Sequence, residues 1–304
     1  MDYRIPAISG AMIALLPIGV AAQDITGAAT FGLGSYDSSD GFNDFSTRSL
    51  DGEIDLKFSN GLMFGATAAT TRADVDGIAE DASVNTFGLS AGYAFASQWN
   101  GGVYFENSEF ALEGFGSESV DSYGLFVGYS SDLMDFEVFG GETDGYVVSG
   151  AGIDWNDLGL SLSYNIGPDG QFGGHVMRSH LSRGAVEVDM VSTGLGGHYA
   201  FGQGFTGFAG VTHATIEEFA GDVTTVGVGV GYDLSAFTNF GAVASLELAR
   251  SRLDDGTDTY DEDSIRIGVT VPLGGTTSLP MNSVARSALS PNRMAVSSTL
   301  IGAY

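Results

Sequence analysis

Charged side chains recur at alternate positions of one short segment of the sequence. Asp51, Glu53, Asp55 and Lys57 are each separated by one residue, and the residues between them are mainly apolar. Because successive side chains of a β-strand point to opposite faces, this spacing predicts a row of charges on one face of a strand. The chemistry of such a row is electrostatic, since its carboxylates create a field that attracts cations.

The same alternation, followed through the other predicted strands, places further charges on the corresponding face. The candidate pore-lining residues are Asp51, Glu53, Asp55, Lys57, Glu106, Asp135, Glu137, Glu247 and Arg266. Seven of them are acidic and two are basic. If this face lines a water-filled lumen, its field favours cations. In the alternative interpretation, these polar side chains only solvate the interior.

Aspartates also gather between the predicted strands, at Asp37–Asp44, Asp74–Asp81 and Asp254–Asp263. Acidic loops can bind Ca²⁺ or link to lipopolysaccharide through divalent cations. None of the three has the twelve-residue spacing of an EF-hand, and solvated acidic loops are the favoured explanation. No resident cofactor is expected, and Ca²⁺ at these external loops is the one ion that the pattern allows.

The residue types that could support catalysis show no defining spacing. The histidines are His175, His180, His198 and His213, and none stands in a recognisable Ser–His pattern. The glycine-rich stretch 227–231 resembles a dinucleotide-binding loop, but no helix follows the strand predicted there. We therefore expect no enzyme, and we interpret these glycines as small residues that pack in a barrel wall.

An internal repeat of about 35 residues organises the strands that carry the charges. Each unit ends in an aromatic residue followed by a short polar turn. These aromatic residues are Phe58, Tyr93, Tyr129, Tyr164, Tyr199 and Tyr232, at steps of 35, 36, 35, 35 and 33. A unit of this length accommodates two strands of about ten residues, one short turn and one longer loop, as in a transmembrane hairpin. The recurring rings predict an aromatic girdle at one membrane interface.

The hairpins add up to about 14 strands, the first at 24–36 and the last at 262–273. Because Tyr146–Trp155 is either a loop or a strand, 12 to 16 strands are possible. The predicted fold is all-β, a transmembrane antiparallel up-and-down β-barrel, whose closure leaves no unpaired edge in lipid. A soluble secreted β-protein remains the alternative, because alternation alone does not require a membrane.

The composition agrees with a chain that separates apolar from acidic groups. The net charge is −27 although the mean hydropathy is +0.13. A barrel in lipid places its apolar groups outside and its polar groups in the lumen and loops. The acidity excludes nucleic acid as an expected partner. The chain has no Cys and therefore no disulfide framework.

The two ends of the chain differ from the repeat. Residues 1–22 have the pattern of a cleaved signal peptide, with Arg4 before an apolar stretch and small residues at Val20–Ala22. The barrel is predicted over 23–273. We interpret 274–304 as a C-terminal tail, with or without a terminal strand. Tyr304 favours such a strand, whereas the best final strand ends at Leu273.

The signal peptide, the segment Asp24–Gly34 and the recurrent Gly-Tyr-x-Phe/Leu strand ends carry a family resemblance over residues 1–273. In these features the sequence resembles the Gram-negative porin family, particularly the short acidic porin-like proteins of alphaproteobacteria. The resemblance implies a channel in the cell outer membrane for passive diffusion of small hydrophilic solutes or ions. It also implies contact with outer-membrane lipid and lipopolysaccharide, and often a homotrimer.

One feature departs from that family. Typical porins narrow the pore with a long third loop, but here the third loop is only Ala111–Glu118. No constriction residues can be transferred to this sequence, and the homotrimer that the resemblance implies is left open. The lumen is expected to be open or filled by its own side chains. A non-conducting barrel with a structural or surface-interaction role is the alternative function.

Overall fold

The computed structural model describes residues 24–39, 43–77, 81–114, 116–217, 221–237, 241–274, 279–295 and 297–299. The predicted signal peptide lies outside the described residues. No helix within these ranges combines the length and the apolar character needed to cross a membrane.

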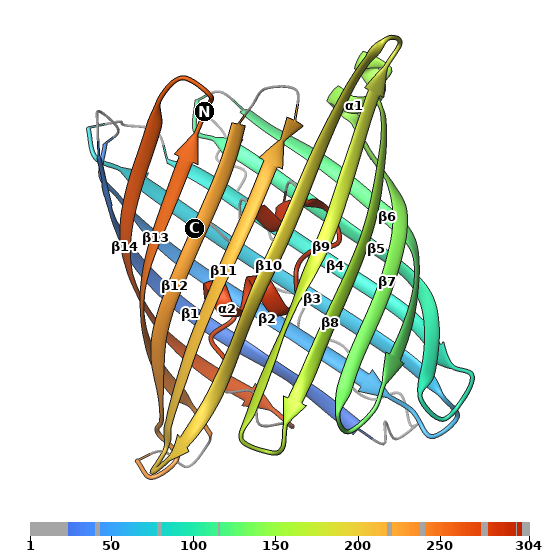
Figure 1. Cartoon of the computed structure of the whole chain (residues 1–304), viewed down its shortest axis with the longest axis vertical. Helices are drawn as coiled ribbons and strands as arrows, with labels where there is room; N and C mark the ends of the chain where they lie inside the picture. Colours follow the sequence, from blue (N-terminus) through green and yellow to red (C-terminus); the bar gives the residue numbers. More distant parts are fainter. Residues whose placement is uncertain are drawn as a thin grey trace, which may run out of the picture.

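Antiparallel strands, each hydrogen-bonded to its neighbours in sequence, form a closed barrel in the described part of the chain (Figure 1). They are β1 (Asp24–Ser38), β2 (Phe45–Lys57), β3 (Leu62–Val75), β4 (Ala82–Ala94), β5 (Trp99–Leu112), β6 (Gly116–Ser130), β7 (Met134–Gly145), β8 (Asp154–Ile166), β9 (Gly170–Arg183), β10 (Val186–Gly202), β11 (Phe205–Ile216), β12 (Gly221–Asp233), β13 (Val243–Asp254) and β14 (Thr259–Leu273).

Closure joins the first strand to the last. β1 pairs with β14 in a register that sets Thr30 opposite Thr270, and their hydroxyl groups are hydrogen-bonded at 2.9 Å. The predicted barrel and its fourteen strands are thereby confirmed. The ambiguous segment near residue 150 forms a short helix, α1 (Tyr146–Ala151), before β8 begins at Asp154.

The two faces of the wall have opposite character. Outward side chains include Leu125, Leu158 and Leu195, whose exposed fractions are 66%, 62% and 68%. Inward side chains at other levels of the same wall include Ser122 and Thr270, which are fully buried. Soluble proteins rarely expose an apolar belt of this extent, so the outer face matches lipid, and the soluble alternative is disfavoured.

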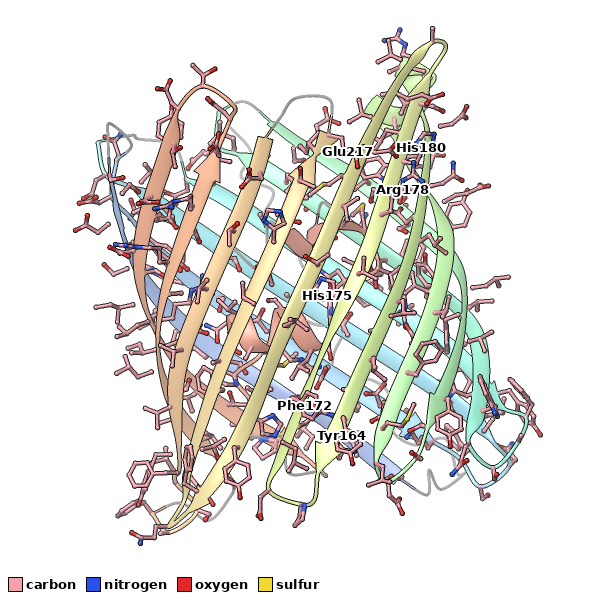
Figure 2. All side chains as sticks on the ribbon, in the orientation of Figure 1. Tyr164, Phe172, His175, Arg178, His180 and Glu217 are labelled. Carbon is pink, nitrogen blue, oxygen red and sulfur yellow. The ribbon has the colours of Figure 1, made fainter. Side chains whose placement is uncertain are left out.

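The repeated aromatic residues gather at the end of the barrel that carries the short turns. Five of the six, all but Tyr93, have a described aromatic neighbour, for example Tyr164 beside Phe172 with 5.5 Å between ring centroids, and Phe205 beside Tyr232 at 4.7 Å. Figure 2 shows Tyr164 and Phe172 at this end, far along the wall from Arg178 and His180. Their role as a membrane girdle stays a prediction.

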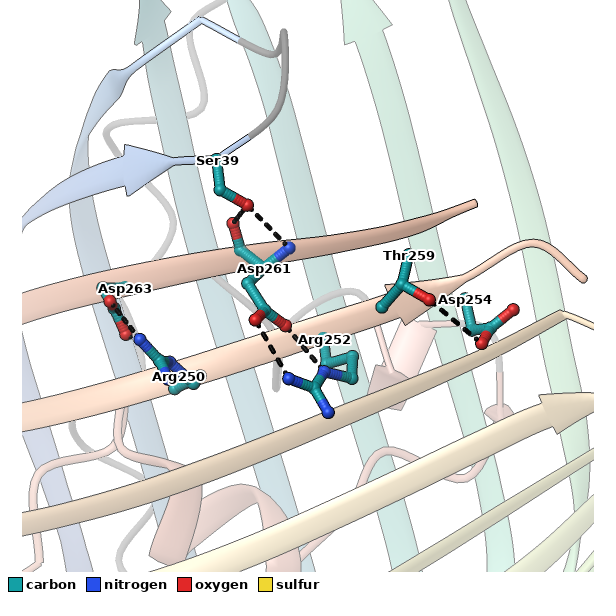
Figure 3. Close-up of polar contacts among 7 residues, drawn as sticks. All are labelled: Ser39, Arg250, Arg252, Asp254, Thr259, Asp261 and Asp263. Atoms are coloured by element: carbon teal, nitrogen blue, oxygen red, sulfur yellow. Dashed lines mark hydrogen bonds and ion pairs between the residues drawn. The ribbon is translucent and has the colours of Figure 1, made fainter. Parts of the chain in front are cut away.

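Acidic side chains near the opposite end are engaged by arginines and by a threonine hydroxyl (Figure 3). Arg250 pairs with Asp263 at 2.6 Å, and Arg252 pairs with Asp261 at 2.7 Å. Asp254 accepts hydrogen bonds from the Thr259 hydroxyl and from a turn N–H. Among the described residues, no three His, Asp or Glu side chains converge on a point that could hold a metal ion. Calcium at the acidic loops stays a prediction.

Candidate functional site

The lumen of the barrel contains the C-terminal part of the chain. We call residues 279–295 and 297–299 the lumen segment; it includes helix α2 (Val284–Leu289), drawn in red inside the barrel in Figure 1. Its residues contact β1, β2, β5, β7, β9 and β13, which lie on different sides of the wall. One short segment can reach all of these strands only from the interior.

Helix α2 rests on a floor of glycines in β10, β11 and β12. A Cβ atom on Gly210 would lie 2.6 Å from the backbone nitrogen of Ala285, and one on Gly227 would lie 2.7 Å from Cγ2 of Val284. The wall therefore comes close to the helix because it lacks side chains there. A six-residue helix is marginal by itself, so this packing and the Ser283 cap stabilise α2.

Ion pairs and charged hydrogen bonds connect the lumen segment to the wall. Arg286 pairs with Glu53 of β2. Arg293 forms a two-pronged contact with Glu137 of β7, with Nε at 3.0 Å and Nη2 at 3.1 Å, and also faces Glu106 of β5. Because these groups are shielded from bulk water, the pairs hold the segment more firmly than surface salt bridges do.

Backbone groups of the segment are also satisfied by the wall. The N–H of Val284 donates to Glu247 at 3.0 Å, and the N–H of Met281 donates to Thr30 at 3.1 Å. The carbonyl of Ala288 lies 2.8 Å from Nδ1 of His175. These contacts fix the position of the segment at several heights of the barrel, and each is non-covalent.

The segment leaves part of the lumen empty. A cavity of about 90 Å³ lies between it and the wall of β2, β3 and β4. Asp51 and Glu53 border the space from the wall, and Arg286 borders it from the segment. A solute in this space would therefore meet carboxylates on one side and a guanidinium on the other.

All nine candidate pore-lining residues lie on the inward face of the wall. Glu53, Glu106, Glu137, Glu247 and Arg266 contact the lumen segment.

The other four form no hydrogen bond or ion pair with the described residues of the lumen segment. Asp51 borders the empty space. Asp55 and Lys57 are exposed, and Asp135 binds the Ser130 hydroxyl near the short turns.

Sequence reasoning missed the partners of these residues. The sequence places Arg286 and Arg293 in a C-terminal tail, with or without a terminal strand. The last residues of that tail that the structure describes, 297–299, are helical. The usable signal was charge: an inward face with seven acids and two bases calls for cations, and the tail carries two of the chain's 11 basic residues.

No protein family model matches the sequence, and no curated protein matches it. Solved structures share its fold. An anion-selective porin from Comamonas acidovorans is 10% identical with a TM-score of 0.54, covering 82% of this chain and 99% of the porin. The CymD monoaromatic hydrocarbon channel is 10% identical with a TM-score of 0.53, covering 84% of this chain and 90% of CymD.

A Pseudomonas aeruginosa FadL homologue is 11% identical with a TM-score of 0.50, covering 83% of this chain and 90% of the homologue. At these identities the likeness shows the fold alone. The resemblance to porins is thus supported at the level of the barrel, and no family model identifies the chain as a porin.

Proposed function

We propose that this protein is an outer-membrane channel for passive diffusion of small hydrophilic solutes or ions, and that the lumen segment sets its conductance. The observation that carries the proposal is the cavity of about 90 Å³ between the segment and β2–β4, bordered by charged side chains. The solved channels with the same fold support a transport role.

The lumen segment takes the place that an inserted loop has in a typical porin. The loop between β5 and β6 is too short to enter the lumen, since the strands end at Leu112 and restart at Gly116. The segment instead narrows the passage from within, and it is held by non-covalent contacts. Its displacement would widen the passage without breaking any strand pairing.

A preference for cations is part of the proposal. The wall positions carry seven carboxylates against Lys57 and Arg266, and the segment adds Arg286 and Arg293. Carboxylates therefore still outnumber cations, and Asp51 faces the open space directly. This excess supports a field that favours cations over anions.

We further propose lipopolysaccharide as a partner of the outer face. Arg48 and Arg72 are exposed, directly opposite each other on β2 and β3, and on the lipid-facing side of the wall. None of the ion pairs among the described residues involves either arginine. Like charges at directly opposed positions destabilise a sheet, and a bound phosphate would remove that repulsion.

A non-conducting barrel with a structural role is the second candidate. The burial of the lumen segment favours this function, because its most enclosed side chains have an exposed fraction of 0%. These are Val284, Ala285, Ala288 and Met294. A lumen filled in this way could be a permanent core.

Recordings in planar bilayers separate the two functions. The wild-type protein should give small discrete conductance steps, and the R286A/R293A double variant should give steps several-fold larger. A matched control is R250A/R252A, which removes two arginines from the outer face. Silence from the wild type and from the double variant, with a heat-modifiable barrel in both, would establish the structural alternative.

A further inference from the structure

Three aromatic side chains of the wall surround the guanidinium of Arg293. Its Cζ atom lies 4.9 Å from the ring centroid of Tyr104, 5.2 Å from that of Phe126 and 5.9 Å from that of Phe139. The rings come from the adjacent strands β5, β6 and β7, with Phe126 and Phe139 at directly opposed positions. The arrangement matches the aromatic cages that bind organic cations.

Two carboxylates complete the site. Glu137 accepts two hydrogen bonds from Arg293, and Glu106 accepts the Arg293 backbone N–H at 2.9 Å while its other oxygen faces the guanidinium at 3.8 Å. We call Tyr104, Glu106, Phe126, Glu137 and Phe139 the cation cage. The cage offers a guanidinium group both kinds of contact that this group requires. The planar group stacks on the aromatic rings, and its N–H groups pair with the carboxylate oxygens.

All five residues of the cage belong to the wall, although Ala295 of the lumen segment packs in the same hydrophobic cluster as the rings. Inward-facing glycines clear the room in which the rings lie. A Cβ atom on Gly102 would lie 2.8 Å from Cζ of Phe126, and one on Gly124 would lie 2.8 Å from Cε1 of Tyr104. A Cβ atom on Gly159 would overlap the Phe139 ring. The rings are thus set into the wall, where departure of Arg293 would leave them in position.

Arg293, which occupies the cage, is held less firmly than the aromatic rings that surround it. Arg293 is on a segment attached to the barrel by non-covalent contacts, and its side chain keeps 20% of its surface exposed. The three rings are each at least nine-tenths buried. The site therefore has a fixed receptor and a displaceable ligand.

We propose that the cation cage is a binding site for solutes that carry a guanidinium group, and that Arg293 occupies it in place of such a solute when the lumen segment is seated. As a statement about transported solutes, the proposal rests on the function proposed above. As a statement about binding, it stands on the cage alone. A guanidinium solute would compete with Arg293, so its binding and the release of this end of the segment are coupled.

The test is binding of L-arginine to the refolded full-length protein in detergent. Trp155 packs against Met294, the residue after Arg293, so the fluorescence of Trp155 reports on binding in this region. A W99F background leaves Trp155 as the single tryptophan, because the chain contains two. In that background, R293A should bind L-arginine saturably and at least ten-fold more tightly than the unsubstituted protein. L-Glutamine, which lacks the charge, should not bind.

Two further variants identify the site. Adding E137Q to R293A should weaken L-arginine binding at least ten-fold, because the paired oxygens are lost. The matched control R286A removes an arginine from the same segment, but one that pairs with Glu53 and contacts no aromatic ring among the described residues. R286A should not create the tight site. Tight binding to R286A as well, or equal binding to R293A and R293A/E137Q, would overturn the proposal.

A folding failure of R293A does not remove the test. R293K keeps a cation in the cage but cannot form the two-pronged contact, so L-arginine should displace it more easily than it displaces Arg293. An unchanged L-arginine affinity in R293K would count against the cage. Binding in detergent requires no conduction. Binding of L-arginine without conduction would refute the proposed channel function and support the binding site. Conduction without binding of L-arginine would support the channel function and refute the binding site.

Discussion

Valine in place of Gly210 should drive α2 out of its seat without disturbing the barrel. Gly210 faces the lumen from β11, opposite Gly227 of β12 and Gly196 of β10. Valine has a high strand propensity, so the hydrogen-bonded ladder should tolerate it. The added side chain meets the helix directly.

The size of the effect follows from the distances. The new Cβ atom would lie 2.6 Å from the nitrogen and 2.7 Å from the Cα of Ala285, where ordinary contacts are about 3.4–4 Å. Because both atoms are backbone, rotation of a side chain cannot relieve the overlap, and the helix must move. Overpacking of this kind costs about 1–3 kcal/mol. Since 1.4 kcal/mol is a factor of ten, the displaced state should become about 5- to 150-fold more populated.

Bilayer recordings measure this population as the fraction of time in large-conductance openings. G140V is the matched control, because a Cβ atom on Gly140 meets nothing closer than 3.6 Å and no residue of the lumen segment. G140V should conduct like the wild type. If G210V shows no more large openings than G140V, while both migrate as heat-modifiable barrels, the packing of α2 does not limit conduction.

Two further predictions concern charge. D51N/E53Q removes two carboxylates that border the empty space, so the reversal potential measured in a salt gradient should move toward the value of a non-selective pore. The control D74N, at the far end of β3, should leave the reversal potential unchanged. An unaltered reversal potential in D51N/E53Q would place the selectivity elsewhere. R48A/R72A should reduce the amount of lipopolysaccharide that co-purifies with the barrel several-fold. The control is R250A/R252A, whose arginines are already paired with aspartates. Equal amounts of lipopolysaccharide in both variants would exclude the Arg48–Arg72 pair as the contact.

The sequence alone predicts the barrel because the alternating pattern of a β-strand depends only on residues that are close together in the chain. Alternation assigns every residue of a strand to one of two faces, and in a closed wall those faces are the outside of the barrel and the lumen. Hence Glu53, Glu137 and Glu247 could be placed on the inward face from their neighbours alone, and all three lie there.

The lumen segment was not predictable by the same means. Its short helix has no periodicity that distinguishes it from a solvated tail, and its contacts join residues far apart in the chain, such as Arg293 with Glu106. The wall glycines that accept it, including Gly196 and Gly210, look like ordinary barrel glycines in the sequence. Only the surplus of inward carboxylates indicated that a cationic partner was missing.

The most direct test of the central claim is to lock the segment in place. The chain has no natural cysteine, so G196C/A288C would form a single defined disulfide between β10 and α2. A Cβ atom on Gly196 would lie 3.0 Å from that of Ala288, and the usual separation of about 3.8 Å in a disulfide requires only a small shift of the helix. With the segment setting the conductance, the oxidised protein should show small steps only, and large openings should appear on reduction. Equal conductance in the two states would contradict the claim.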